Sequence, residues 1–380
     1  MRKEINLPFI NDLEGSIQAA QPLIQVIIGP RQVGKTTGIH RYLESLDLAK
    51  FHYASADGSI SKQSSWLEEQ WLILHSMSSK GLLVIDEIQK VENWSETLKK
   101  LWDAQKRKTE KVQVIVLGSS SLSIQRGLSE SLTGRFQLHR VHQWNLAESF
   151  EAYGLDLENY LSYGGYPGSY GFISDRPTWL NYVRDSIVDT VIGRDILQLA
   201  RVKSPALFRQ TFDLACSYGG QELSYNKLLG QLQDKGNVEL VKHYLELFEG
   251  AFLLKQLFKF SNKKTLARSS SPKILPLAPA LYSLTLDGDL NAEERGRAFE
   301  IAVGCELTRL PGTLSYWRER NDEVDFIHTY GKNITAIEVK SGRKKSARGL
   351  SRFREQFPKS EALLMTPENY QRQISTLAKL

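Results

Sequence analysis

The sequence of 380 residues has few cysteines and no long apolar run. Its two cysteines, Cys216 and Cys305, stand far apart in apolar segments, so they form neither a disulfide framework nor a zinc site. Two scattered thiols are typical of proteins in a reducing cytoplasm. No window approaches the roughly 20 apolar residues of a membrane-spanning helix, and residues 1–15 lack the apolar stretch of a signal peptide. We therefore expect a cytoplasmic protein that does not associate with a membrane.

The charge balance bears on the kind of partner, and the length bears on the number of domains. Lys and Arg number 49 against 43 Asp and Glu, which gives a formal net charge of +6 at pH 7. This mild excess suits a polyanionic partner, although net charge bears on association and not on fold. The chain is long for a single hydrophobic core, so we expect about two or three domains.

Short apolar runs alternate with longer amphipathic segments over residues 1–150. The runs are rich in Val, Ile and Leu, as buried parallel strands are, and the segments between them are long enough for crossover helices. The pattern predicts a doubly wound α/β domain with a parallel sheet. The expected strands are Leu23–Ile28, Phe51–Ser55, Leu82–Ile85, Val112–Leu117 and Phe136–Val141.

The segment Gly29-Pro-Arg-Gln-Val-Gly-Lys-Thr36 fits the P-loop pattern G-x-x-x-x-G-K-[ST], and it stands between an expected strand and an expected helix. In such a loop, backbone N–H groups wrap the phosphates of a nucleotide, and the helix N-terminus adds partial positive charge. Lys35 is expected to reach the β- and γ-phosphates, and Thr36 to bind Mg²⁺. The sequence therefore predicts binding of ATP with Mg²⁺. The predicted nucleotide-binding residues are Gly29, Pro30, Arg31, Gln32, Val33, Gly34, Lys35, Thr36 and Thr37.

An acidic pair ends the third expected strand, Leu82-Leu-Val-Ile-Asp-Glu87. The carboxyl ends of parallel strands are where open α/β sheets bind ligands. We expect Asp86 to hold the Mg²⁺ and Glu87 to act as the general base on the attacking water. The alternative is that the pair only caps a helix.

The P-loop, the acidic pair and the polar-ended strand Val114–Ser121 together resemble the AAA+ branch of the P-loop ATPases. The resemblance implies that Ser119 or Ser120 contacts the γ-phosphate or the attacking water. Arg135, just before the fifth expected strand, resembles the arginine finger that reaches a neighbouring subunit's site, which implies a homo-oligomer. The alternative is a surface arginine that caps a loop. No Asn-Lys-x-Asp guanine motif stands in a suitable place, so adenine is preferred.

After Phe150 the pattern changes. Residues 151–210 are rich in aromatic residues and mostly helical in pattern, which predicts a helical lid, and residues 211–290 give two short helices and a strand. That order is typical of a winged-helix domain. We expect a helix over Leu223–Gln233, a turn over Asp234–Asn237, a helix over Val238–Phe248, a strand over Phe252–Phe260 and a basic wing or linker over Ser261–Ser271.

Residues 291–380 form a further α/β segment, with a helix from about Glu293 to Leu310 and strands near Val324–Thr329 and Ile334–Val339. Alternate residues of a strand share a face, so Glu338 and Lys340 point the same way, and a short hairpin brings Asp325 beside them. Asp325 and Glu338 can hold Mg²⁺ while Lys340 orients water or steadies developing charge. A cross-strand charge pair is the alternative.

This D…E-x-K arrangement resembles the PD-(D/E)xK nuclease superfamily, which makes Glu300, in the preceding helix, the acid of the first motif. A basic run follows at once, as a surface that grips a phosphate backbone requires. A solvated helix face is the alternative for that run. Its residues are Arg343, Lys344, Lys345, Arg348, Arg352 and Arg354.

The whole chain resembles a bacterial and archaeal family of AAA+ ATPases that carry a winged helix and a C-terminal nuclease-like domain. The matching segments are Gly164–Pro167, Arg194–Ile196, Val241–Phe248 and Glu338–Lys340. One departure is Pro272–Pro279, which lacks the acid that such proteins usually carry after Pro-Lys.

The resemblance favours an Mg²⁺-dependent ATPase that remodels or translocates duplex or branched DNA, with nuclease activity left open. A regulatory switch, in which ATP sets assembly with a partner and the nuclease-like domain only binds, is the alternative. The expected DNA contacts are Lys263, Lys264, Arg343, Lys344 and Lys345.

Overall fold

The computed structural model divides the chain into two compact units. We call Glu4–His142 with Gly193–Ala200 the N-terminal unit, and Met1–Lys3 with Gln143–Ile192 and Arg201–Leu380 the C-terminal unit. The described residues are 5–19, 22–46, 51–58, 63–78, 80–105, 110–118, 121–197, 202, 204–232, 237–261, 270–286, 289–342 and 347–377.

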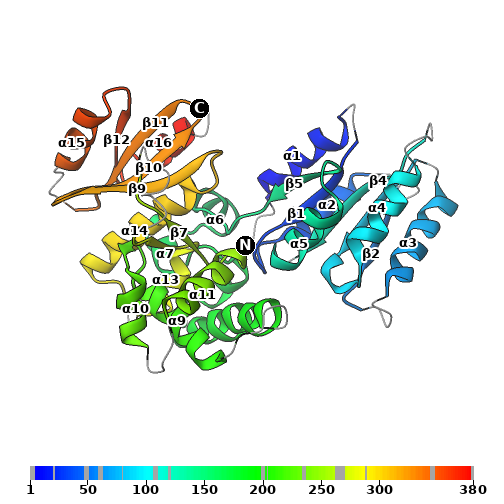
Figure 1. Cartoon of the computed structure of the whole chain (residues 1–380), viewed down its shortest axis with the longest axis horizontal. Helices are drawn as coiled ribbons and strands as arrows, with labels where there is room; N and C mark the ends of the chain where they lie inside the picture. The colour runs from blue at the N-terminus through cyan, green and yellow to red at the C-terminus, as the bar shows by residue number, and fades with distance from the viewer. Residues whose placement is uncertain are drawn as a thin grey trace. The chain divides into compact units, whose positions relative to one another are not determined.

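The N-terminal unit is built on a five-stranded parallel sheet with the strand order β2-β3-β4-β1-β5 (Figure 1). The strands β1 and β3 are buried along their whole length, as expected of continuous apolar runs in a parallel sheet. The predicted α/β fold with its parallel sheet is confirmed, and each strand lies within one residue of the expected bounds. The strands are β1 Ile24–Ile28, β2 Phe51–Ser55, β3 Leu82–Asp86, β4 Gln113–Gly118 and β5 Phe136–Arg140.

Helices cover this sheet. The first, α1, contacts α2, β1 and β5, whereas α3, α4 and α5 form a second row of helices that contact one another in turn. The strand β1, which leads into the P-loop, lies between β4 and β5, so β4 separates it from β3 and its acidic pair. The helices are α1 Pro8–Ile17, α2 Lys35–Glu44, α3 Ser64–Met77, α4 Trp94–Ala104 and α5 Ser121–Ser131.

The C-terminal unit starts with short helices, as its sequence predicts. Asn145 caps α6 with a capping box that includes Glu148, and Asp156 caps α7. Two wide π-helical stretches follow in close succession, and the second, Val191–Ile196, continues from this unit into the N-terminal unit. The elements are α6 Leu146–Tyr153, α7 Leu157–Tyr163, the 3₁₀-helix η3 Pro167–Phe172, α8 Arg176–Asn181, η4 Tyr182–Val188 and η5 Val191–Ile196.

The next elements form a helix, a strand, two helices and two strands, and the three strands pair as an antiparallel sheet with the order β6-β8-β7. The first expected helix starts later than predicted, at Tyr225, because the Ser224 side chain accepts from the Lys227 N–H and caps it. The expected strand Phe252–Phe260 is confined to β7. The elements are α9 Pro205–Ser217, β6 Gln221–Glu222, α10 Tyr225–Gln231, α11 Val238–Gly250, β7 Leu254–Leu257, β8 Lys273–Pro276 and α13 Pro279–Ser283.

A four-stranded mixed sheet ends the chain, with the order β12-β11-β10-β9. The two predicted strands lie within β10 and β11, which form an antiparallel hairpin, while β11 and β12 are parallel. The edge strands β9 and β12 and the last helix were not predicted. The elements are α14 Ala292–Leu307, β9 Thr313–Glu319, β10 Asp322–Tyr330, β11 Asn333–Val339, α15 Arg348–Gln356, β12 Glu361–Met365 and α16 Tyr370–Leu377.

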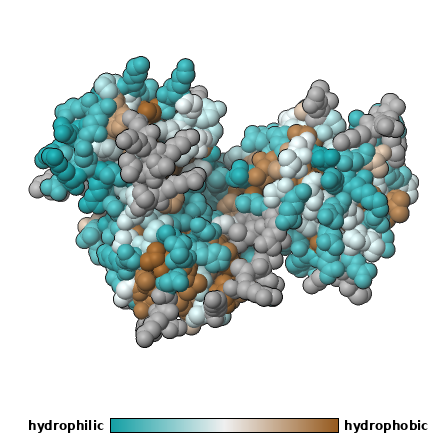
Figure 2. Space-filling model, in the orientation of Figure 1, coloured by the Kyte–Doolittle hydropathy of each residue, from teal (hydrophilic) through white to brown (hydrophobic). Residues whose placement is uncertain are grey.

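Both faces of the four-stranded sheet are covered by helices. On one face α14 brings Phe299 and Ile301 into a core with Phe326 and Ile337, and on the other face α15 packs Phe353 with Trp317 and Val324. The outer surface of this part is mainly hydrophilic in the view of Figure 2. Among the described residues, no helix is long and apolar enough to cross a membrane.

Candidate functional site

The P-loop joins the end of β1 to the start of α2. Gly34 adopts a left-handed conformation, with φ 89°, which a side chain disfavours. At Gly29 a Cβ atom would lie 2.4 Å from the carbonyl oxygen of Val141, so that position excludes any larger residue. The motif therefore has its glycines where the backbone requires them, and the helix begins at Lys35, as predicted.

Lys35 is folded against its own loop. Its ammonium donates to the carbonyl oxygens of Gly29, at 2.9 Å, and Pro30, at 2.5 Å. Burial lowers the pKa of Lys35 to about 8, against the attraction of the Glu87 and Asp86 carboxylates, which raises it. The loop thus holds a cation whose charge is only partly compensated by protein groups.

Thr36 and Asp86, the two predicted Mg²⁺ ligands, lie together although a strand separates β1 from β3. The Thr36 hydroxyl donates to Asp86 Oδ2 at 2.8 Å, and the Glu87 N–H donates to Asp86 Oδ1 at 2.8 Å. A hydroxyl and a carboxylate are hard oxygen ligands of the kind that Mg²⁺ prefers. The side chains present therefore fit a magnesium ion beside the loop.

Tyr53 is a further member of this site that no motif indicated. Its hydroxyl donates to the same oxygen, Asp86 Oδ2, at 2.9 Å. Burial, followed by the neighbouring Asp86 carboxylate, raises the pKa of Tyr53, so this group stays a proton donor. Tyr53 reaches Asp86 because β2 pairs in parallel with β3. The sequence could have indicated this contact only through a correct prediction of the strand order.

Glu87, the expected general base, stands in a left-handed conformation with φ 53° at the start of the turn Ile88–Lys90. The Gln89 amide donates to Glu87 Oε2 at 2.6 Å and so orients the carboxylate. Gln89 was not predicted, because no sequence motif indicates a residue that orients the Glu87 carboxylate from two positions further along a tight turn. Ser119 and Ser120, the expected contacts to the γ-phosphate, lie outside the described residues.

Arg31, inside the P-loop, is paired with a distant part of the chain. Its guanidinium donates to both carboxylate oxygens of Asp195, each at 2.7 Å, and the Asp195 side chain is 8% exposed. The hydrogen bond to Asp195 raises the pKa of Arg31. Asp195 belongs to the segment Arg194–Ile196, to which the sequence analysis gave no role in the site.

Arg135, the predicted arginine finger, lies at the amino end of β5, whereas the P-loop follows the carboxyl end of the parallel strand β1. Within one chain it is therefore at the opposite edge of the sheet from the nucleotide site. Its guanidinium forms a bidentate pair with Asp103, at 2.9 Å for each bond, and donates to the Thr133 carbonyl at 3.1 Å. These contacts fit the loop-capping alternative, and action on a neighbouring copy stays a prediction.

The C-terminal unit brings Glu300, Asp325, Glu338 and Lys340 into one cluster, as the hairpin predicts. Lys340 Nζ lies 2.5 Å from Glu338 Oε1. Asp325 Oδ2 accepts from the Val339 N–H at 2.8 Å. Burial raises the pKa of Glu300 to about 7 and that of Glu338 to about 7, because the charged forms lose their hydration.

Lys273, which the sequence reading missed, enters this cluster from β8. Its side chain is 1% exposed, and Nζ lies 2.6 Å from Glu300 Oε1 and 3.5 Å from Asp325 Oδ1. The neighbouring carboxylates raise the pKa of Lys273 in spite of the burial that opposes them. In the sequence, only the position of this lysine at the start of the apolar run Lys273–Pro276 could have indicated a buried charge.

A polar groove lies in the C-terminal unit where the three-stranded and four-stranded sheets approach each other. Among the described residues, neither Lys259 nor Arg320 forms an ion pair, while Arg318 pairs with Glu222 at 3.2 Å. We call this the basic groove. Its lining residues are Glu222, Ser224, Lys227, Lys259, Ser270, Ser271, Tyr316, Arg318 and Arg320.

The structure describes only some of the basic residues that the sequence predicts to contact DNA or to form a basic surface. Lys263, Lys264, Arg343, Lys344 and Lys345 lie outside the described residues. Of the others, Arg348 pairs with Asp322 at 3.0 Å and Arg352 with Glu355 at 2.7 Å, which fits the alternative of a solvated helix face.

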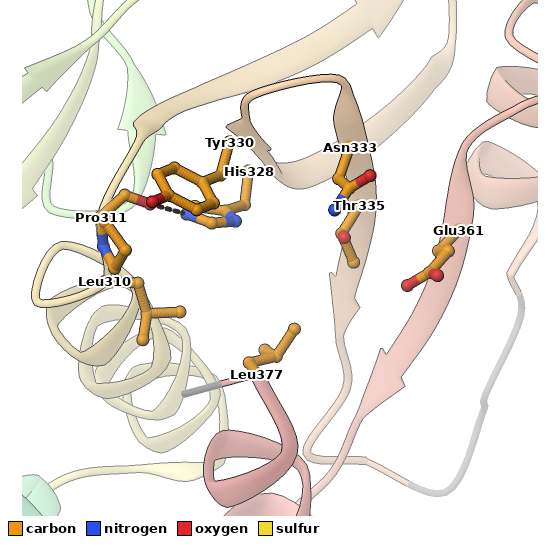
Figure 3. A pocket seen from close by; sticks show the side chains of 8 residues that line it. All are labelled: Leu310, Pro311, His328, Tyr330, Asn333, Thr335, Glu361 and Leu377. Carbon is orange, nitrogen blue, oxygen red and sulfur yellow. Dashed lines mark hydrogen bonds between the residues drawn. The ribbon is translucent and has the colours of Figure 1, made fainter. Parts of the chain in front are cut away.

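A second, more enclosed pocket lies at the hairpin end of β10 and β11 (Figure 3), and none of the cluster's carboxylates lines it. His328 Nε2 lies 2.9 Å from the carbonyl oxygen of Pro311 at its rim. With Glu361 as its single acid, the pocket gathers no group of catalytic side chains. It is lined by Leu310, Pro311, His328, Tyr330, Asn333, Thr335, Glu361 and Leu377.

The parallel sheet with its strand order and the P-loop give the N-terminal unit an AAA+ P-loop fold. Residues 21–150 match the family model described as AAA domain. Residues 154–289 match a model described as Domain of unknown function (DUF8612), and residues 295–379 match one described as Domain of unknown function (DUF4143).

The chain aligns over most of its length with relatives from archaea and bacteria. The chain is 25% identical over 342 residues to Uncharacterized protein MJ1544 of Methanocaldococcus jannaschii, which covers 83% of this chain and 74% of that protein. It is 28% identical over 329 residues to Uncharacterized protein Rv2008c of Mycobacterium tuberculosis, with 83% and 70% covered.

The similar solved structures include the Holliday junction branch migration motor RuvB of Thermotoga maritima, at 18% identity and a TM-score of 0.33, covering 65% of this chain and 88% of that chain. They also include the ORC1 protein of Aeropyrum pernix in complex with DNA, at 13% identity and a TM-score of 0.31, covering 73% and 91%. Scores this low do not define a common arrangement, so the fold assignment depends on the strand order and the P-loop.

Proposed function

We propose that the chain is an Mg²⁺-dependent ATPase that acts on DNA. The observation that carries the ATPase part is the 2.8 Å contact between Thr36 Oγ1 and Asp86 Oδ2, beside a P-loop in which Lys35 donates to the Gly29 carbonyl. The loop N–H groups and Lys35 would bind the phosphates, and Thr36 and Asp86 would hold the ion. Mg²⁺ held there would supply positive charge that offsets the charge of the phosphates.

Glu87 takes the proton from the attacking water in this proposal, and Gln89 keeps its carboxylate in position. A general base of this kind contributes about 10²–10⁴-fold in rate. Arg135 would complete the site of a neighbouring copy, so the proposal includes a homo-oligomer. Hydrolysis by an isolated chain would then be slow.

Two observations support DNA as the partner. The order helix, strand, two helices, two strands over α9 to β8 resembles that of a winged-helix domain, a fold that often binds DNA. The second observation is the basic groove. It brings together Lys and Arg, the residue types that contact a phosphate backbone, at Lys227, Lys259, Arg318 and Arg320. Residues 151–210 would form the lid that follows the ATPase core.

The test is ATP turnover by the full chain alone and with single-stranded, duplex and branched DNA. We expect duplex or branched DNA to raise the rate, and the double variant Lys259→Glu/Arg320→Glu to lose that stimulation while it keeps the basal rate. Removal of one phosphate contact should flatten the log-affinity against log-salt slope by roughly one unit. The matched control, Lys80→Glu/Lys100→Glu, reverses two exposed charges outside the groove.

A regulatory switch is the second candidate, in which ATP sets assembly with a protein partner. The Arg31–Asp195 pair favours it, because this contact connects the nucleotide loop with the chain segment that leads to the other unit. ATP turnover that responds to no DNA, in a preparation with normal basal activity, would favour the switch.

A further inference from the structure

We propose that the Lys273 ammonium takes the place of a divalent cation in the C-terminal carboxylate cluster, so that this domain binds its partner without metal-dependent cleavage. The cluster contains the carboxylates and the lysine expected of a Mg²⁺-dependent nuclease site. It also contains a second lysine, on a strand of the neighbouring sheet, whose charged end lies among those carboxylates.

The position of the ammonium is the first argument. Lys273 Nζ lies 2.6 Å from Glu300 Oε1, 3.5 Å from Glu323 Oε1 and 3.5 Å from Asp325 Oδ1. It is also 3.4 Å from the Asp325 carbonyl oxygen. The ring centroid of Phe326 is 5.3 Å away, within the range of a cation–π contact. A buried ammonium needs such compensation, and here acids from α14 and β10 supply it.

The remaining carboxylate oxygens are the second argument. Asp325 Oδ2 accepts from the Val339 N–H, and Glu338 Oε1 lies 2.5 Å from Lys340 Nζ. Glu338 Oε2 and Glu300 Oε1 are buried and accept no hydrogen bond from the described residues, but Lys273 Nζ lies 2.6 Å from Glu300 Oε1. Mg²⁺ binds through one or two carboxylates and keeps several waters, and here the Lys273 ammonium lies against the Glu300 and Asp325 oxygens that such an ion would need. Across the described part of the chain, no three His, Cys, Asp or Glu side chains are arranged to hold a metal ion.

Charge is the third argument. A divalent ion among these carboxylates would lie within a few ångströms of the Lys273 ammonium, and like charges at such a distance repel strongly in a dry site. Lys273 cannot withdraw easily, because it is 1% exposed and belongs to the central strand of the three-stranded sheet. The cluster is therefore filled by a cation that belongs to the protein.

The ammonium also has a consequence for the basic groove. Glu323, which lies beside Lys273, is 3.9 Å from Arg318, and Arg318 pairs with Glu222. A chain of alternating charges thus connects the buried cluster with the groove. In this arrangement Lys273 is a positioning residue. Its ammonium compensates the charge of the Glu323 carboxylate, so the Arg318 guanidinium stays directed to the groove.

The test is Mn²⁺ binding to the full chain without nucleotide, followed by electron paramagnetic resonance. We expect the wild type and Asp325→Asn to bind Mn²⁺ equally. We expect Lys273→Met, which removes the charge and keeps an unbranched side chain, to gain one site with a dissociation constant on the order of 10⁻⁴–10⁻³ M. The double variant Lys273→Met/Asp325→Asn should lose that site, and Lys340→Met, with Lys273 intact, should not gain it.

Two results would overturn the proposal. One is a Mn²⁺ site in the wild type that Asp325→Asn or Glu338→Gln removes. The comparison of the wild type with these two variants does not depend on whether Lys273→Met folds. The other is a folded Lys273→Met protein that gains no site. Supercoiled DNA incubated with the wild type and Mg²⁺ or Mn²⁺ should stay intact. ATP turnover is measured on the same samples, so failure of this proposal is distinguished from failure of the proposed ATPase.

Discussion

Arg31 and Asp195 are 164 residues apart in the chain, yet they form a bidentate ion pair beside the P-loop. Asp195 is nearly buried, so the loss of Arg31 leaves a carboxylate without its partner. We expect Arg31→Ala to lower the free energy of unfolding by about 3 kcal/mol, the lower end for a buried pair, because Arg31 keeps 23% exposure.

The measurement is urea unfolding of the full chain. The exposed pair Lys242–Glu239 is the matched control, and Lys242→Ala should cost only about 0.2–1 kcal/mol. A double variant, Arg31→Met/Asp195→Leu, should recover part of the loss, because no charge is left unpaired. Equal losses for Arg31→Ala and Lys242→Ala would contradict the expectation.

Nucleotide affinity should fall as the pH rises above about 8. Burial lowers the pKa of Lys35 to about 8 in the free chain, and bound phosphates favour the charged form. Binding therefore takes up a proton near this pH, and the affinity decreases once the free lysine is neutral. Titration with a fluorescent ATP analogue from pH 6.5 to about 9.5 measures this. Lys35→Arg, always charged, should show weaker binding with a flat profile.

Glu87→Gln should keep nucleotide binding and lose hydrolysis by about 10²–10⁴-fold, because the substitution removes the base and leaves Thr36 and Asp86 intact. Gln89→Leu should lower kcat by less and leave nucleotide affinity unchanged, since Gln89 only orients Glu87. Single-turnover rates and separate binding titrations distinguish the two effects. Normal turnover in Glu87→Gln would exclude it as the base.

Arg135 offers a test of action between copies. Arginine fingers contribute about 10³–10⁵-fold in rate, so mixing Arg135→Ala with Lys35→Ala protein should restore activity at mixed interfaces. Asp103→Ala is the matched control, because it removes the partner that holds Arg135 within its own chain. If Arg135 only caps a loop, both single variants lose stability alike and no mixture recovers activity.

The C-terminal unit should become more stable as the pH falls from about 7 toward 5. Burial raises the pKa of Glu338 to about 7 from its ordinary value of 4.5, so the folded chain binds more protons than the unfolded one between these values. The free energy of unfolding then decreases as the pH rises through this window. Glu338→Gln should weaken this dependence in urea unfolding, with the part due to Glu300 retained, whereas Glu355→Gln, at an exposed position, should leave it as in the wild type.

The five parallel strands could be predicted from the sequence because strands buried on both faces are continuous apolar runs. Motif spacing also indicated the P-loop, Asp86 and Glu87. The groups that complete each site could not be found in this way. Asp195 and Lys273 reach their partners only through the tertiary fold, and the strands β9 and β12 mix polar and apolar residues at the sheet edges.

The π-helix Val191–Ile196 connects the two units along the chain. Its first residues belong to the C-terminal unit, and the rest, with Asp195, belong to the N-terminal unit. A π-helical turn carries one residue more than an α-helical turn, and it can be lost by a shift in register. Because Asp195 is bonded to Arg31 of the P-loop, ATP bound there in the proposed ATPase would be thermodynamically linked to the register of this helix. Linkage is reciprocal, so a ligand that favoured one register would change the affinity for ATP by the same factor by which ATP changes the affinity for that ligand.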